Sequence, residues 1–307
     1  MNIKKIHGFF IPGHIPLTLL ILGFILFRFL HTEEGGSLEF WGLMTMQTGT
    51  AFLLLYLNRA FIIIRRRTLL PVFFYLLFTG LNPAYHCTWS SGIASLCVLL
   101  FFIFLFSTSR QSYPQGNAFN IALILTLGSF VWQPLLFFFL VLWLGSAYLH
   151  ELNFRSFFGS LTGFAVIYLF IFTGSIYLGD NPDIFMDKLP DLRALFQFRP
   201  LEGFTRPDYM IAGALFVLFI VAGSNIFSRS ISENTKTIVS LSFLYIVTFF
   251  VFVFLFLQPQ WKNEWFSILC LPLSLLVAHL FSMPSRWLIT WLMLLSIAFF
   301  LTVPFLK

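Results

Sequence analysis

Charged residues are scarce in this chain of 307 residues. Aspartate, glutamate, lysine and arginine make up 10% of it, and hydrophobic residues make up 59%. Soluble globular chains carry about 25% charged residues. Because so few polar side chains could not cover a surface that faces water, lipid must be the solvent for most of the chain. The composition therefore excludes an ordinary soluble protein and indicates an integral membrane protein.

Cysteines are also few, and the sequence shows no known catalytic or ligand-binding motif. The three cysteines, Cys87, Cys97 and Cys270, show no spacing typical of a metal or redox site. The sequence also contains no glycine-rich phosphate loop, no His-Glu-x-x-His zinc pair and no serine elbow. We therefore expect neither a metal nor a cofactor, and the sequence by itself names no reaction.

Ionisable residues are also missing from the middle of the long apolar runs, where the polar residues are hydroxyls and amides. Ion-coupled transporters usually place Asp, Glu, His or Arg in that zone, so the pattern disfavours them. A nucleic-acid interface would need a basic patch clear of the membrane. Only residues 65–67, three arginines, come close, and an anchor for the cytoplasmic end of a helix explains them better. We expect no nucleic-acid partner, although the formal net charge is +6.

The apolar runs that remain predict a polytopic bundle of about eleven transmembrane helices, which is an all-α fold. The predicted spans are residues 15–30, 41–64, 69–80, 92–106, 118–132, 135–149, 156–178, 210–227, 237–257, 266–281 and 287–305. Ten or twelve spans remain open, because residues 69–80 are short for a span. That run either continues past Pro83 or lies tilted and partly shielded by its neighbours. We treat residues 1–307 as a single integral membrane domain.

The loops between these runs sort their charges by side. One set of loops is rich in Lys and Arg, and the other holds most of the Asp and Glu. Short loops rich in Lys and Arg stay in the cytoplasm during insertion. This places the N-terminus inside and, with an odd number of spans, Lys307 outside. The long outer loop, residues 179–208, carries Phe185, Leu189, Leu192 and Phe196 at helical spacing, which predicts a short amphipathic cap.

Several polar or small residues within this frame are expected to be structural. Gly159 and Gly163 share one helix face, where another helix can approach closely. Residues 58–59 (Asn-Arg) are a polar interruption in the apolar inner end of the second span, where the Arg59 side chain is expected to reach toward the cytoplasmic headgroups. Residues 150–155 contain a histidine, a glutamate and an arginine between two spans, for which a local ion pair is the simplest explanation.

Candidate catalytic residues lie on the predicted outer rim. Glu33 and Glu34 follow the first helix, and Arg193 and Arg199 lie on the amphipathic loop. Arginine forks bind phosphate oxygens, and a carboxylate could remove a proton from an acceptor hydroxyl. These four residues would suit an enzyme that uses a lipid-linked phosphate donor. Ordinary rim charges explain the same residues, because every outer loop must be polar.

Four stretches carry a family resemblance. They are residues 58–75 (NRAFIIIRRRTLLPVFFY), 117–134 (NAFNIALILTLGSFVWQP), 155–168 (RSFFGSLTGFAVIY) and 271–281 (LPLSLLVAHLF), with a tryptophan-containing last helix. In this order they resemble a family of multi-pass inner-membrane proteins of Bacteroidetes that is catalogued as a domain of unknown function. The resemblance covers most of the chain, rests on apolar patterns and a few polar landmarks, and implies an inner-membrane setting in a Gram-negative envelope.

A looser, fold-level analogy links the chain to membrane glycosyltransferases and polymerases that use polyprenyl-phosphate sugars. These enzymes place an acid just after the first helix, which Glu33 or Glu34 would match, or arginines in a large outer loop, which Arg193 or Arg199 would match. The chain departs from both patterns, because its first outer loop is short and its spans fill nearly the whole sequence.

Two functions therefore stay open. The leading interpretation is a protein of the inner membrane that supports envelope biogenesis without catalysis of its own. Its partners would be the bilayer and other envelope proteins. The alternative is a glycosyltransferase-like or polymerase-like enzyme at the outer face, with a lipid-linked phosphate substrate.

Overall fold

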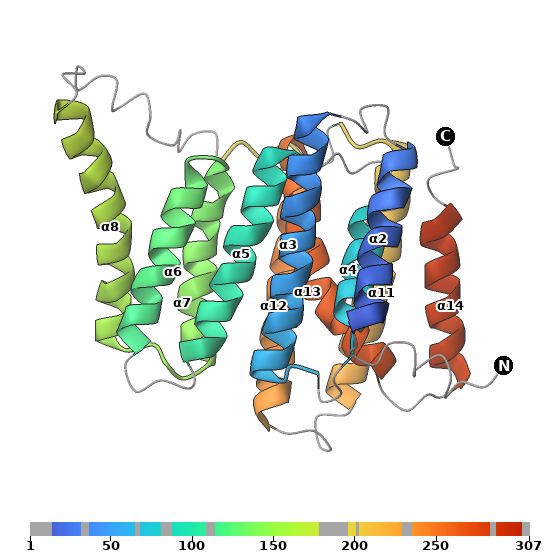
Figure 1. Cartoon of the computed structure of the whole chain (residues 1–307). Coiled ribbons are helices and arrows are strands. Elements are labelled where there is room, and N and C mark those ends of the chain that lie inside the picture. Colours follow the sequence, from blue (N-terminus) through green and yellow to red (C-terminus); the bar gives the residue numbers. More distant parts are fainter. Residues whose placement is uncertain are drawn as a thin grey trace. The chain divides into compact units, whose positions relative to one another are not determined.

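The computed structural model describes residues 14–31, 37–64, 68–80, 88–108, 114–177, 196–200, 203–228, 235–282 and 287–302. In this part of the chain it contains eleven α-helices and two short 3-10 helices, without a strand. The all-α fold class predicted from the sequence is therefore confirmed (Figure 1).

The helices follow the predicted apolar runs, with one α-helix for each run. Their bounds are α2 His14–His31, α3 Leu38–Phe61, α4 Leu70–Gly80, α5 Trp89–Thr108, α6 Pro114–Ser129, η1 Gln133–Phe137, α7 Phe138–Tyr148, α8 Phe154–Tyr177, α11 Arg206–Ser228, α12 Thr235–Leu257, η2 Pro259–Trp261, α13 Lys262–Ser282 and α14 Trp287–Thr302.

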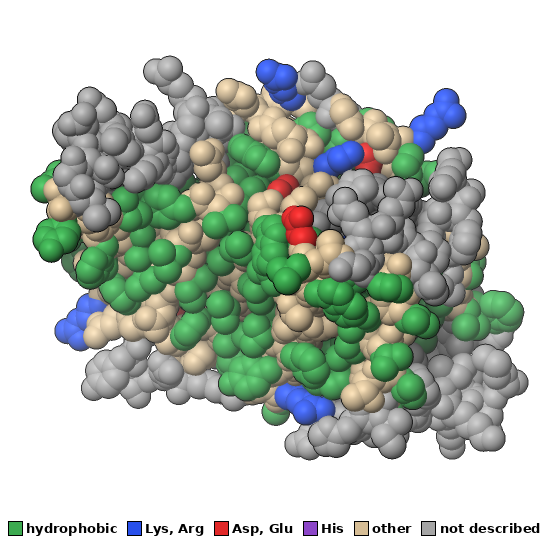
Figure 2. Space-filling view, turned by 45° about the horizontal axis from the view of Figure 1, so that its top comes forward, with side chains coloured by type: hydrophobic (Ala, Val, Ile, Leu, Met, Phe, Trp, Pro, Cys, Tyr) green, Lys and Arg blue, Asp and Glu red, His purple; other side chains and the backbone are tan. Residues whose placement is uncertain are grey.

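Among the described residues, six helices are long and apolar enough to cross a membrane. They are Leu38–Phe61, Trp89–Thr108, Phe154–Gly174, Arg206–Ser228, Thr237–Leu257 and Pro259–Ser282. Hydrophobic side chains cover much of the face seen in Figure 2, which is how helices in contact with lipid present themselves. Together these features indicate a membrane protein. The count of eleven spans and the cytoplasmic N-terminus stay predictions, and most of the predicted cap, residues 179–208, lies outside the described residues.

By its packing the chain divides into two compact units. Unit 1 comprises Met1–Gly92 and Pro200–Lys307, and unit 2 comprises Ile93–Arg199. The single integral domain expected over residues 1–307 stays a prediction.

Helix α13 forms the centre of unit 1. It packs against α4, α11, α12 and α14, and every residue from Trp265 to Ser282 is buried. Helix α4 also contacts α2, α3 and α14, and the ring of its Phe74 stacks on Phe281 of α13 with 5.3 Å between centroids. Among the residues of α4, Phe73 alone is not buried. The short helix α4 is thus shielded by its neighbours, which agrees with one of the two alternatives for residues 69–80.

In unit 2 the close approach predicted at the paired glycines is confirmed. A Cβ atom on Gly159 would lie 2.8 Å from the carbonyl oxygen of Gln115, and one on Gly163 would lie 2.6 Å from that of Phe119. Both oxygens belong to the backbone of α6, which cannot swing aside as a side chain can. Glycine at these two positions lets α8 pack directly on α6.

Asn58 and Arg59, the polar pair near the inner end of the second predicted span, both lie within α3. The helix continues to Phe61, and Ile62 then adopts a left-handed backbone conformation (φ 52°, ψ 45°). The buried side chain of Asn58 accepts a hydrogen bond at Oδ1 from the backbone N–H of Ile64, at 3.1 Å. Asn58 therefore satisfies a backbone donor where the chain leaves the helix.

Candidate functional site

Polar side chains from distant parts of the sequence meet where α5, α11 and α13 begin. We call this group the helix-start cluster; its members are Ser90, Thr205, Asp208, Lys262 and Glu264. Helices α11 and α13 each begin four residues before the predicted span, at Arg206 and Lys262. Charges expected in loops therefore lie in the first turns of two helices, within unit 1.

Asp208 is the most deeply buried member of the cluster, with 1% of its surface exposed. Its Oδ2 atom accepts hydrogen bonds from the backbone N–H and the hydroxyl of Thr205, both at 2.8 Å. An acid three residues after a threonine forms a capping box, in which the side chain satisfies a free N–H at the helix start. Pro207 fits the same turn because the first N–H groups of a helix have no partner within it.

Lys262 completes the environment of Asp208 from the start of α13. Its Nζ atom lies 2.9 Å from Oδ2 of Asp208, and 28% of the lysine side chain is exposed. A buried carboxylate is costly without such a partner. The pair spans 54 residues of sequence and joins the start of α11 to the start of α13.

Ser90 and Glu264 make a second connection, between α5 and α13. The Ser90 hydroxyl donates a hydrogen bond to Oε1 of Glu264 at 2.5 Å. On either side of Ser90, Thr88 and Ser91 form a reciprocal cap at the start of α5. The backbone N–H of each donates to the hydroxyl oxygen of the other, at 3.0 and 3.2 Å. Glu264 lies in the first turn of α13, where an acidic side chain interacts favourably with the positive end of the helix dipole.

The cluster is thus built as a set of links between helix starts. Oδ2 of Asp208 accepts from three donors and Oε1 of Glu264 from one. Such bonds hold each side chain in one orientation. Within the residues that the structure describes, no group of three or more His, Cys, Asp or Glu side chains is placed to hold a metal ion.

The sequence contained a signal for half of this arrangement. Thr205 and Asp208 stand three residues apart around a proline, which is the pattern of a helix start. Thr88 and Ser91 show the same spacing. The links to Lys262 and Glu264 carry no comparable signal, because both depend on helices that are remote in sequence.

The structure describes one of the four predicted catalytic residues. Glu33, Glu34 and Arg193 lie outside the described residues. Arg199 is described in the segment 196–200, where it is exposed. In the same segment Phe196 packs edge-on against Phe137 of η1, with 6.1 Å between ring centroids. The role assigned to these four residues stays a hypothesis.

A separate acid, Glu151, lies at the corner between α7 and α8 in unit 2. His150 adopts a left-handed backbone (φ 58°), and the N–H of Glu151 donates to the carbonyl of Ser146 at 2.8 Å. The Oε2 atom of Glu151 is buried without a hydrogen-bond partner, and Arg155 is exposed. The local ion pair expected here is therefore not formed. Burial raises the pKa of the Glu151 carboxyl from 4.5 to about 7.

Comparison with known proteins gives one match. A family model described as a family of unknown function, DUF6427, matches residues 5–306. No curated protein and no solved structure matches the chain. Since the family model covers nearly the whole sequence, the chain belongs to this family of unknown function.

Proposed function

We propose that this chain is a multi-pass protein of the inner membrane that supports the biogenesis of a Gram-negative envelope without catalysing a reaction. The observation that carries the proposal is the helix-start cluster. Its buried carboxylate, Asp208, is bound by Thr205 and Lys262, so this group joins the starts of two helices. A carboxylate that acts as a general base must instead lie within reach of a proton of the substrate.

Such a protein would act through its shape and its contacts. Unit 1, in which neighbouring helices enclose α13, would offer a platform in the bilayer for other envelope proteins. Its direct partners would be lipids and those proteins.

Genetic complementation tests this proposal against the enzyme alternative. The quadruple variant Glu33→Gln, Glu34→Gln, Arg193→Ala and Arg199→Ala removes every predicted catalytic group. It should restore a deletion strain to the parental tolerance of detergents and of large antibiotics that an intact envelope excludes. The amount of protein in the inner-membrane fraction is measured alongside.

A quadruple variant that reaches parental levels in the membrane and yet fails to complement would contradict the proposal. That outcome would favour a transferase that uses a lipid-linked phosphate donor. The matched control is Arg206→Ala with Glu39→Gln, which changes an exposed arginine and an exposed glutamate outside the predicted site.

A further inference from the structure

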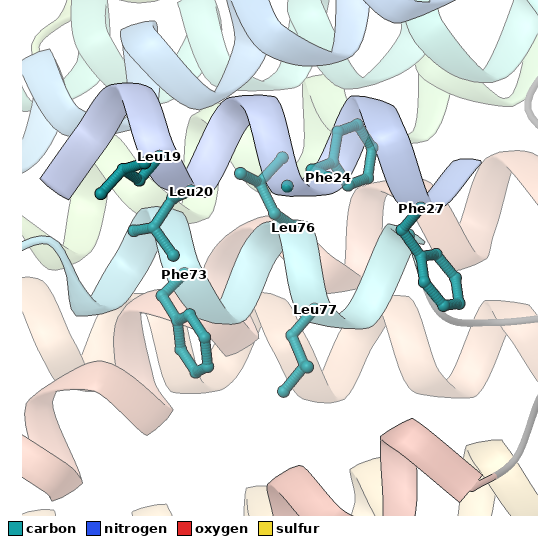
Figure 3. A pocket seen from close by; sticks show the side chains of 9 residues that line it. Leu19, Leu20, Phe24, Phe27, Phe73, Leu76 and Leu77 are labelled. Atoms are coloured by element: carbon teal, nitrogen blue, oxygen red, sulfur yellow. The ribbon is translucent and has the colours of Figure 1, made fainter. Parts of the chain in front are cut away.

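An apolar groove runs between α2 and α4 in unit 1 (Figure 3). It encloses about 260 Å³ and is lined by hydrophobic side chains and two glycines. The lining residues are Leu19, Leu20, Gly23, Phe24 and Phe27 of α2, with Phe73, Leu76, Leu77 and Gly80 of α4.

The two helices run side by side in the same direction. Leu19 and Leu20 lie level with Phe73 at one end, and Phe24 packs against Gly80 toward the other (Figure 3). At Gly80 the Phe24 ring fills the space, since a Cβ would lie 2.5 Å from it. At Gly23 no atom lies within 4 Å of the position of a Cβ, so the groove is open there.

The length of the groove fits one leaflet of a bilayer. Helix α4 has 11 residues, which rise about 16 Å at 1.5 Å per residue. The hydrocarbon core of a membrane is about 30 Å thick, so α4 covers about half of it. One acyl chain of a phospholipid covers the same depth, from its headgroup to the middle of the bilayer.

Charge at one end of the groove completes the match. Arg28 directly follows Phe27, the last lining residue of α2, and is half-buried. The remaining lining is apolar, so this arginine is the nearest cation along α2. A guanidinium binds phosphate oxygens through paired hydrogen bonds.

We propose that this groove binds one acyl chain of a membrane phospholipid, with the lipid phosphate at Arg28. The acyl chain would fill the space between the apolar side chains that line the groove. The lipid headgroup would lie at the membrane–water interface, where arginine side chains place their guanidinium groups.

Photo-crosslinking in lipid nanodiscs tests the proposal on the full-length protein. Phosphatidylglycerol and diacylglycerol, each with a diazirine on the same acyl chain, serve as probes. Labelled peptides are identified by mass spectrometry. Phosphatidylglycerol should label peptides of α2 and α4 about tenfold more than diacylglycerol, and Arg28→Gln should remove the difference.

Gly23→Leu tests the groove itself. The new side chain grows into open space, so it should fill the groove without displacing the backbone and lower labelling by at least about tenfold. Gly213→Leu is the matched control, because Gly213 of α11 is also exposed with open space and does not line the groove. Leu19→Trp, at a position 56% exposed, fills the groove from another residue if Gly23→Leu folds poorly.

Three results would overturn the proposal. One is equal labelling by the two probes, and another is labelling that survives Gly23→Leu and Leu19→Trp in folded protein. The third is a groove that neither probe labels, which would mean that protein occupies it. Melting temperature and size-exclusion profile establish folding for every variant.

Discussion

A single carboxyl group at a chain corner links this protein's stability to pH. The Oε2 atom of Glu151 is buried without a partner, and the neighbouring Arg155 is exposed. Because burial disfavours the charged form and no cation offsets it, the pKa of Glu151 rises from 4.5 to about 7. The folded protein therefore holds a proton on this group at pH values where the unfolded chain has lost it.

Stability should consequently fall as pH rises from about 4.5 to about 7, and this loss should level off above that window. Glu151→Gln cannot ionise and should flatten the slope. The measurement is the melting temperature of detergent-solubilised protein as a function of pH. Glu39→Gln, a change at an exposed glutamate of α3, should leave the slope as it is. A parental slope in Glu151→Gln would assign the pH dependence to another group.

Lys262 should matter to stability through its bond to Asp208. Lys262→Met keeps the length of the side chain but leaves the Asp208 carboxylate 1% exposed without its cation. The expected loss is about 1–3 kcal/mol, below the value for a fully buried pair because the lysine is partly exposed. Thermal unfolding in detergent measures it.

A double-mutant cycle separates this pairing from general damage. Asp208→Asn should remove most of the further cost of Lys262→Met, because the partner charge is gone. Arg206→Met, in the same turn of α11 but exposed, is the control and should cost little. Additive losses in the cycle would show that the pair contributes no coupling energy.

At the scale of whole elements, the contact between α6 and α8 depends on two glycines of α8, which have no side chain to separate the helices. Leucine at Gly159 or Gly163 would place atoms on the backbone carbonyls of α6, less than 3 Å away. Lipid gives no hydrophobic force that would push the two helices together again after such a separation.

Gly159→Leu and Gly163→Leu should each lower the yield of folded protein and cost about 3 kcal/mol. Gly174→Leu is the control on the same helix, because no atom lies within 4 Å of its Cβ position. Fluorescence-detected size exclusion and melting temperature in detergent provide the comparison. Unchanged yield and stability in both test variants would mean that this face of α8 is turned toward lipid.

Helix positions could be predicted from the sequence, whereas their ends could not always be. Apolar runs located every α-helix that the structure describes, because burial in lipid or protein selects long hydrophobic segments. The ends depend on single contacts. The predicted span continues to residue 64, whereas α3 ends at Phe61 and the Asn58 side chain accepts a hydrogen bond from the N–H of Ile64. Lys262 lies in the first turn of α13, where its Nζ atom contacts the Asp208 carboxylate from 54 residues away.

The candidate site shows the same limit. The capping pattern of Thr205 and Asp208 is local and therefore readable from sequence. The bond between Ser90 and Glu264 spans 174 residues, and no periodicity in the chain encodes it. Glu33, Glu34 and Arg193 were predicted from their chemistry and their position along the chain, and their role remains a hypothesis for experiment.

For the molecule as a whole, the distribution of charge predicts which loops stay in the cytoplasm. Reporters fused after Arg67, Arg110 or Arg229 should be cytoplasmic, because Lys and Arg are retained on that side during insertion. Reporters near Gly36, near Gly203 or at the C-terminus should be exported. Paired phosphatase and fluorescent-protein fusions read both outcomes. A cytoplasmic C-terminus would contradict the odd number of spans, and α4 would be the first helix to re-examine.

The enclosed position of α13 also determines the order in which the helices of unit 1 can pack during synthesis. The ribosome delivers α13 tenth among the eleven described α-helices, yet α4, among the earliest, packs against it. Unit 2 is continuous in sequence, so all of its residues have been synthesised before synthesis of α11 begins. The N-terminal helices of unit 1 must therefore wait in the membrane with the α13 face of α4 uncovered until α13 arrives. During that interval a nascent chain is most exposed to wrong partners, and membrane chaperones would have their best opportunity to hold it.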